Sequence, residues 1–253
     1  MPRQKKSIRP LIIVLCVIAL IVIVVSRSYY SAENSSQDPR IVPAREMYEK
    51  YNHFADNQQY DSIFKLMDAI EGIYASLDHY KDSYETGVLY NNRAAAWLTR
   101  VISDQSTDSL IRDSLLNLAN HALRSGIRIY ETWQDQYNNK EADEIRNGIR
   151  DDFMTGLESY TPEERERFLQ TRVSEISEAQ TEIDRRLSVT YTNLGIVYRH
   201  RQQYDSAMGC YEKALDLWDR NLTAENNMNS LLGLPQKKRN FIERMFPPER
   251  IRD

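Results

Sequence analysis

The chain has 253 residues, of which 41% are hydrophobic and 28% charged, with only 8 glycines and 8 prolines. This composition is typical of a helical protein and excludes a turn-rich β fold. The formal net charge is −4, and leaving out the five basic residues up to Arg27 leaves 28 basic against 37 acidic residues, a charge of −9. A polyanion such as nucleic acid is therefore excluded as a main partner.

An unbroken apolar run follows a basic N-terminus. Residues 1–9 contain four basic side chains and no acidic one, and residues 10–26, which include LIIVLCVIALIVIVV, carry no charge. A membrane-spanning helix needs about 20 residues, with a range of roughly 17 to 25, and basic residues favour the cytoplasmic side. We therefore predict a cytoplasmic basic tail at 1–9, a transmembrane signal-anchor at 10–26, and export of everything after Ser26.

Other uses of the apolar run are weaker. A cleaved signal peptide is the main alternative, because Val24-Val25-Ser26 offers residues small enough for cleavage. A lipoprotein signal at Cys16 is disfavoured because Leu15 occupies the position that needs a small residue. Burial of the run in a soluble core is disfavoured by its basic flanks.

The rest of the chain divides into a linker and a helical domain. Residues 27–42, RSYYSAENSSQDPRIV, are polar, aperiodic and rich in serine, which predicts a linker. From Pro43 onward the apolar residues follow a helical period, and few segments alternate as strands do. We expect an exported all-α domain at 43–253.

Internal repetition organises this domain. NQQYDSIF at 57–64 recurs as RQQYDSAM at 201–208, and LYNNRAAAWL at 89–98 has the small and aromatic spacing of YTNLGIVY at 191–198. Small residues let two antiparallel helices approach closely, and neighbouring aromatic residues fill the space between stacked pairs. The repeated pattern indicates helix packing rather than an active site.

Residues 188–221 resemble the tetratricopeptide repeat, a 34-residue unit; the matching positions are Tyr191, Leu194, Gly195, Tyr198, Ala207, Tyr211 and Ala214. Residues 87–130 match in their first helix but carry about thirteen extra residues between the two helices. Residues 44–77 depart most, with Lys50 and Tyr51 at the Leu-Gly pair. The resemblance implies tetratricopeptide-like helical hairpin repeats, an α-solenoid that follows the N-terminal transmembrane helix.

One long helix is predicted before and through the third copy. Thr161, Pro162 and Glu164 form a helix start with a capping box, and the apolar residues that follow keep to one helical face. We expect a helix from Pro162 to about Arg201, roughly 60 Å long. A break near Arg185 is the alternative.

The C-terminal part predicts a cap for the array. Helix starts at Thr223 and Pro235 indicate capping helices over 223–246. Repeat arrays need such elements because the last repeat otherwise exposes an apolar face.

The chain lacks the short motifs of common catalytic sites. It has no phosphate loop, no glycine-rich dinucleotide turn, no nucleophile elbow and no paired cysteine motif. The four histidines are scattered and none has metal-ligand spacing. We expect no enzyme activity, no cofactor and no metal; a cleft with a histidine and a carboxylate within hydrogen-bond reach would revive an enzyme hypothesis.

These features favour a membrane-anchored tetratricopeptide-like scaffold or adaptor that binds a protein or peptide outside the cytoplasm, at the periplasmic or extracellular face. The alternative is an exported sensory or regulatory input module that binds a ligand. The resemblance implies that the first helices of the repeats line a concave face, so the candidate partner-binding residues are Asn91, Asn92, Leu98, Thr192, Asn193, Ile196, Arg199 and His200.

Asn92 and Asn193 occupy the register that tetratricopeptide co-chaperones use to clamp a C-terminal carboxylate. The positions of the clamp cations in the second and third copies hold Val88 and Val189. We therefore expect, in place of a clamp, an extended peptide held by side-chain amides, aromatic contacts and Arg199. That the two asparagines merely bond neighbouring helices is an equally open alternative.

Overall fold

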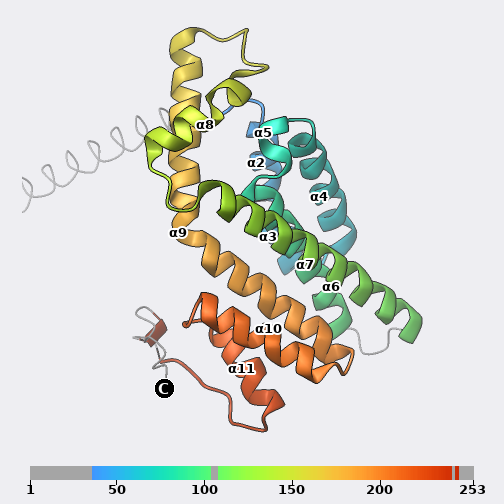
Figure 1. Ribbon diagram of the computed structural model, residues 1–253. Coiled ribbons are helices and arrows are strands. Elements are labelled where there is room, and N and C mark those ends of the chain that lie inside the picture. Colours follow the sequence, from blue (N-terminus) through green and yellow to red (C-terminus); the bar gives the residue numbers. More distant parts are fainter. Residues whose placement is uncertain (1–35, 104–107, 241–242, 245–253) are drawn as a thin grey trace, which may run out of the picture.

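The computed structural model describes residues 36–103, 108–240 and 243–244. The elements in these ranges are all helices: α2 (Val42–Glu49), α3 (Tyr51–Asp56), α4 (Tyr60–Ala75), α5 (Asp78–Lys81), α6 (Tyr84–Ser103), α7 (Ser109–Tyr137), α8 (Ala142–Met154), α9 (Pro162–His200), α10 (Tyr204–Leu217) and α11 (Leu222–Leu231). Figure 1 shows α9 running along the molecule, with α2 to α7 beside it and α10 and α11 at one end.

The predicted tail and membrane span at 1–26 lie outside the described residues. Among the described residues, no helix is both long enough and apolar enough to cross a membrane. Membrane anchoring therefore stays a prediction from the sequence.

Helix α9 confirms the long helix expected from the sequence. The Thr161 hydroxyl accepts a hydrogen bond from the Glu164 backbone N–H at 3.2 Å, and Glu164 Oε2 accepts one from the Thr161 backbone N–H at 2.9 Å. This capping box begins a helix of 39 residues that ends at His200, without a break near Arg185.

Three helical hairpins follow the predicted repeats. The first pairs α2 and α3 with α4, the second pairs α6 with α7, and the third pairs the end of α9 with α10. In the second hairpin the extra residues, which we expected between the two helices, mostly extend those helices, because α6 runs to Ser103 and α7 begins at Ser109. Asp108 caps α7 by accepting a hydrogen bond from the Leu110 backbone N–H at 2.8 Å.

The predicted linker at 27–42 is too long at its C-terminal end. Ile41 is completely buried and Asp38 is 3% exposed. Arg40 forms an ion pair with Asp38 at 2.7 Å and donates hydrogen bonds to the carbonyls of Phe153 and Thr155 at the end of α8. Residues 38–42 therefore belong to the helical domain.

In the described residues of the C-terminal cap, the first predicted helix is present as α11, and the second does not begin where it was predicted. Helix α11 begins near Thr223, but its N-cap is Asn221, whose side chain accepts from the Ala224 backbone N–H at 3.0 Å. Residues 235–240 are not helical, contrary to the start predicted at Pro235. They run back along α11, where the Asn226 side chain bonds both the backbone N–H and the carbonyl of Lys237.

Close helix approach explains the small residues of the repeat. Gly195 and Ala207 are both buried, and a Cβ added at Gly195 would lie within 3.0 Å of three ring atoms of Tyr211. The Tyr211 ring is itself completely buried. Only glycine therefore fits between α9 and this ring, as the spacing predicts.

We expect Gly195→Ala to lower the free energy of unfolding by about 1 kcal/mol or more, because the new methyl group overpacks the hairpin. Gly209→Ala is the matched control: Gly209 lies in α10 with nothing within 4 Å of the added Cβ, so alanine should stabilise its helix by about 0.5–1 kcal/mol. Urea unfolding of both variants checks this, and an equal effect at the two positions would contradict it.

Candidate partner-binding cleft

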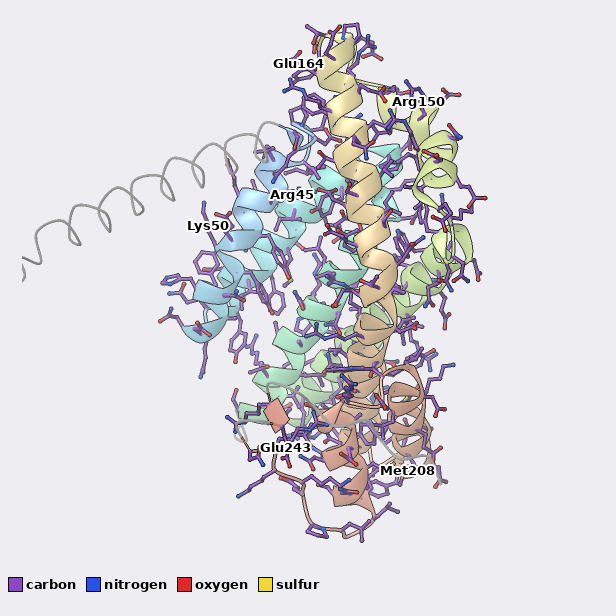
Figure 2. The ribbon with its side chains drawn as sticks, turned by 90° about the vertical axis from the view of Figure 1, so that its left-hand side faces the viewer. Arg45, Lys50, Arg150, Glu164, Met208 and Glu243 are labelled. Carbon is purple, nitrogen blue, oxygen red and sulfur yellow. The ribbon has the colours of Figure 1, made fainter. Side chains whose placement is uncertain are left out.

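Two adjoining recesses lie between α2, α6 and α9. Their volumes are about 560 Å³ and about 290 Å³, and Tyr48, Val88 and Arg186 line both of them. The other lining residues are Arg45, Glu49, Tyr74, Tyr84, Glu85, Leu89 and Glu175 in the larger recess and Asn91, Asn92, Tyr130, Glu182, Arg185 and Val189 in the smaller. Figure 2 shows Arg45 on the side of α2 that faces α9. We call the two recesses together the cleft.

A buried arginine, Arg172, binds two of the carboxylates that line the larger recess. The Arg172 side chain is 2% exposed. Its Nη1 donates to Glu85 Oε1 at 2.5 Å and to Glu175 Oε2 at 3.2 Å, and its Nε donates to His79 Nε2 at 3.0 Å. Glu175 also accepts from Arg45 Nη2 at 2.5 Å. This buried charge network ties α2, α5, α6 and α9 together.

Burial and charge set the protonation of the network. Burial alone would raise the pKa of Glu85, but the adjacent Arg172 outweighs burial and holds that pKa below its ordinary value. Burial and then Arg172 lower the pKa of His79 to about 3, with smaller effects from Glu85, Arg40 and Asp38. At neutral pH, Glu85 is therefore ionised and His79 is neutral.

His79 also lies near a carboxylate, the arrangement that would revive an enzyme hypothesis. Its Nδ1 is 3.5 Å from Oδ2 of Asp152. The pair lies outside the cleft, however, because the His79 side chain is 6% exposed and lines neither recess. Its Nε2 already accepts the Arg172 hydrogen bond, so no lone pair is available to take a proton from a substrate. The pair is structural.

A chain of side-chain amides crosses the smaller recess. Nδ2 of Asn193 on α9 donates to Oδ1 of Asn91 on α6 at 3.0 Å, and Nδ2 of Asn91 donates to Oδ1 of Asn92 at 3.4 Å. Nδ2 of Asn92 then donates to the Tyr48 hydroxyl on α2. Asn92 and Asn193 therefore do bond neighbouring helices, while Asn91 and Asn92 also line the recess.

Two of the predicted binding residues are wrong because they are buried. Leu98 is 3% exposed and packs in the core, and Thr192 is 2% exposed. The Thr192 hydroxyl donates to the Ser188 carbonyl at 2.8 Å and accepts from Asn221 Nδ2 at 2.9 Å. Both side chains stabilise the packing of repeat helices and present nothing to a partner.

Three further candidates lie away from the cleft. Arg199 Nη1 donates to Asn227 Oδ1 on α11 at 2.8 Å, and His200 Nδ1 lies 3.2 Å from Arg112 Nη2 on α7. Ile196 is half-buried and packs against the core. Arg199 is thus engaged by the capping helix rather than by the recesses.

Arg186, which lines both recesses, was missed by the sequence analysis. The guanidinium carbon of Arg186 lies 5.6 Å from the centre of the Tyr84 ring. Burial raises the pKa of Tyr48 and of Tyr130, and Arg186 partly offsets this rise in both. The signal was its position: Arg186 precedes Val189 by three residues, which places both on one face of α9.

The comparison with protein families supports the repeat. Residues 188–221, the hairpin formed by the end of α9 and by α10, match the family model described as tetratricopeptide repeat. The chain carries a tetratricopeptide repeat. No curated protein and no solved structure matches the chain significantly. Repeats of this family generally mediate binding between proteins, and Val189 of the cleft lies within the matched repeat.

His79 predicts how stability depends on pH. The ordinary pKa of histidine is 6.5 and that of folded His79 is about 3, so between these values the unfolded chain binds a proton that the folded chain does not. Stability should therefore fall as the pH decreases through this window, by up to about 1.4 kcal/mol per pH unit from His79 alone.

His79→Gln keeps an acceptor for Arg172 but does not titrate, so its unfolding free energy should change less between pH 6.5 and acidic pH. Urea unfolding at a series of pH values measures the slope. His121→Gln, at an exposed histidine of α7, is the control and should retain the wild-type slope. A wild-type slope in His79→Gln would show that this site does not control acid sensitivity.

Proposed function

We propose that this chain is a membrane-anchored scaffold that binds a protein or peptide partner in the cleft, outside the cytoplasm. The observation that carries the proposal is that the cleft opens between α2, α6 and α9, which are the helices that begin the three hairpins, and reaches the tetratricopeptide repeat at Val189. Arrays of such repeats present extended surfaces to their partners.

The chemistry of the cleft suits an extended peptide. Tyr48, Tyr84 and Tyr130 supply rigid apolar area together with hydroxyl groups. Asn91 and Asn92 supply amides that can bond a peptide backbone. A volume of about 560 Å³ in the larger recess accommodates several side chains.

The location rests on the sequence. The uncharged run at 10–26 after four basic residues supports an anchor with a cytoplasmic N-terminus. The repeat domain would then lie at the periplasmic or extracellular face of the cell membrane. The formal charge of −9 on the chain without its five basic residues up to Arg27 disfavours nucleic acid as a partner.

Site-specific crosslinking tests the cleft. A photoreactive residue at Val189, which is 37% exposed and lines the cleft, should capture the partner several-fold more efficiently than one at Lys213, which is exposed on α10. Thr192 is unsuitable because it is buried. Equal capture of the same protein at both positions would exclude the cleft as the binding site.

The topology is tested separately. A reporter fused after Asp253 that is active only outside the cytoplasm should be active, and the domain should be digested by protease added to intact spheroplasts. Protection of the domain would contradict export. A mature N-terminus at Arg27 would replace the anchor by a cleaved signal peptide while leaving the exported domain in place.

A further inference from the structure

Arg186 differs from the other arginines around the cleft. Arg45 pairs with Glu175 at 2.5 Å, Arg172 with Glu85 at 2.5 Å, and Arg185 with Glu182 at 3.0 Å. Within the described part of the chain, Arg186 forms no ion pair within 4.0 Å. Its Nε is buried there without a hydrogen-bond partner.

An unpaired, half-buried guanidinium such as that of Arg186 lowers the stability of the free protein. A half-buried cation loses hydration, and the loss is compensated only when a counter-charge and hydrogen-bond acceptors replace the water. The Tyr84 ring covers one face of the guanidinium. One N–H group of the guanidinium bonds the Tyr130 hydroxyl. The other N–H groups at its edge can donate to the oxygens of a carboxylate.

The place of Arg186 in the cleft indicates where on the partner this carboxylate lies. Arg186 lines both recesses, together with Tyr48 and Val88. One recess therefore lies on each side of the guanidinium, so a bound segment that fills both recesses passes Arg186. A segment that ended here would fill only one recess.

We propose that the cleft recognises an aspartate or glutamate side chain within an extended segment of the partner protein, and that Arg186 binds its carboxylate. This inference rests on the proposed function and names the chemistry of the partner. The Tyr130 hydroxyl, which lies beside Arg186, can donate to the same carboxylate. Three of the acidic residues that line the cleft, Glu85, Glu175 and Glu182, are already paired with arginines of the protein.

Peptide selection with the full-length chain tests the proposal. Random peptides whose C-termini are fused to the carrier contain no free terminal carboxylate, so selection on the wild-type chain should enrich an internal Asp or Glu. In synthetic peptides with blocked ends, replacing that residue by Asn or Gln should weaken binding about tenfold or more, as expected for lost charged hydrogen bonds.

The variant Arg186→Gln should bind the acidic peptide and its amide analogue with affinities that differ by less than about twofold, because the charged partner is gone. Arg150→Gln removes an exposed arginine of α8 that pairs with Glu166 and lines neither recess, and should keep the full preference. Circular dichroism and melting temperature confirm that both variants are folded. Arg186→Lys, which retains the charge but not the planar fork, should show an intermediate preference.

The outcomes separate this inference from the proposed function. Peptides that crosslink at Val189 without an acidic preference, or with a preference that survives Arg186→Gln, would overturn the role of Arg186 and leave the scaffold proposal standing. Peptides that bind only with a free C-terminus would show that Arg186 binds a terminal carboxylate and not an internal Asp or Glu side chain. Failure to select any peptide, together with equal crosslinking at Val189 and Lys213, would overturn both proposals.

Discussion

The arrangement of the cleft depends on one buried guanidinium. Arg172 projects from α9 and binds Glu85 of α6, while Glu175, one turn further along α9, binds both Arg172 and Arg45 of α2. One network of ion pairs therefore joins α2, α6 and α9, the first helices of the three hairpins. Burying these charges is costly, and only good geometry compensates for it. A small shift of one helix would leave a buried charge unpaired, so the network favours a single relative position of the three helices.

The charge network around Arg172 makes the walls of the cleft rigid. The charge network holds the helices below the larger recess, and the amide chain from Asn193 to Tyr48 holds the same three helices across the smaller one. Helix α9 adds rigidity because one uninterrupted helix of 39 residues contributes both to the charge network and to the third hairpin. A partner that enters the cleft meets preformed side chains, which reduces the entropy lost on binding.

Features set by local sequence pattern could be predicted from the sequence. Ion pairs between residues that are distant in the sequence could not. Capping residues and apolar periodicity were sufficient for α9, and the spacing of Gly195, Ala207 and Tyr211 was sufficient for the third hairpin. The extra residues of the second hairpin were placed between the two helices because no local signal distinguishes a longer hairpin from a longer connection. Leu98 and Thr192 were misplaced because the register of a repeat fixes a helix face only approximately. Arg172 gave no signal and Arg186 only its spacing from Val189, since arginines on a helix usually lie on the solvated face.

The free charge of Arg186 is itself a product of the surrounding pairs. Glu182 lies four residues earlier on α9, one turn away, and would be a natural partner for Arg186. Arg185 occupies that carboxylate, however, and is also held over the Trp218 ring at 5.3 Å. Glu175 is likewise engaged by Arg45 and Arg172. Because each of these carboxylates already has an arginine, Arg186 can gain a counter-charge from a partner without breaking a pair inside the protein, and that is the condition under which a binding site can discriminate by charge.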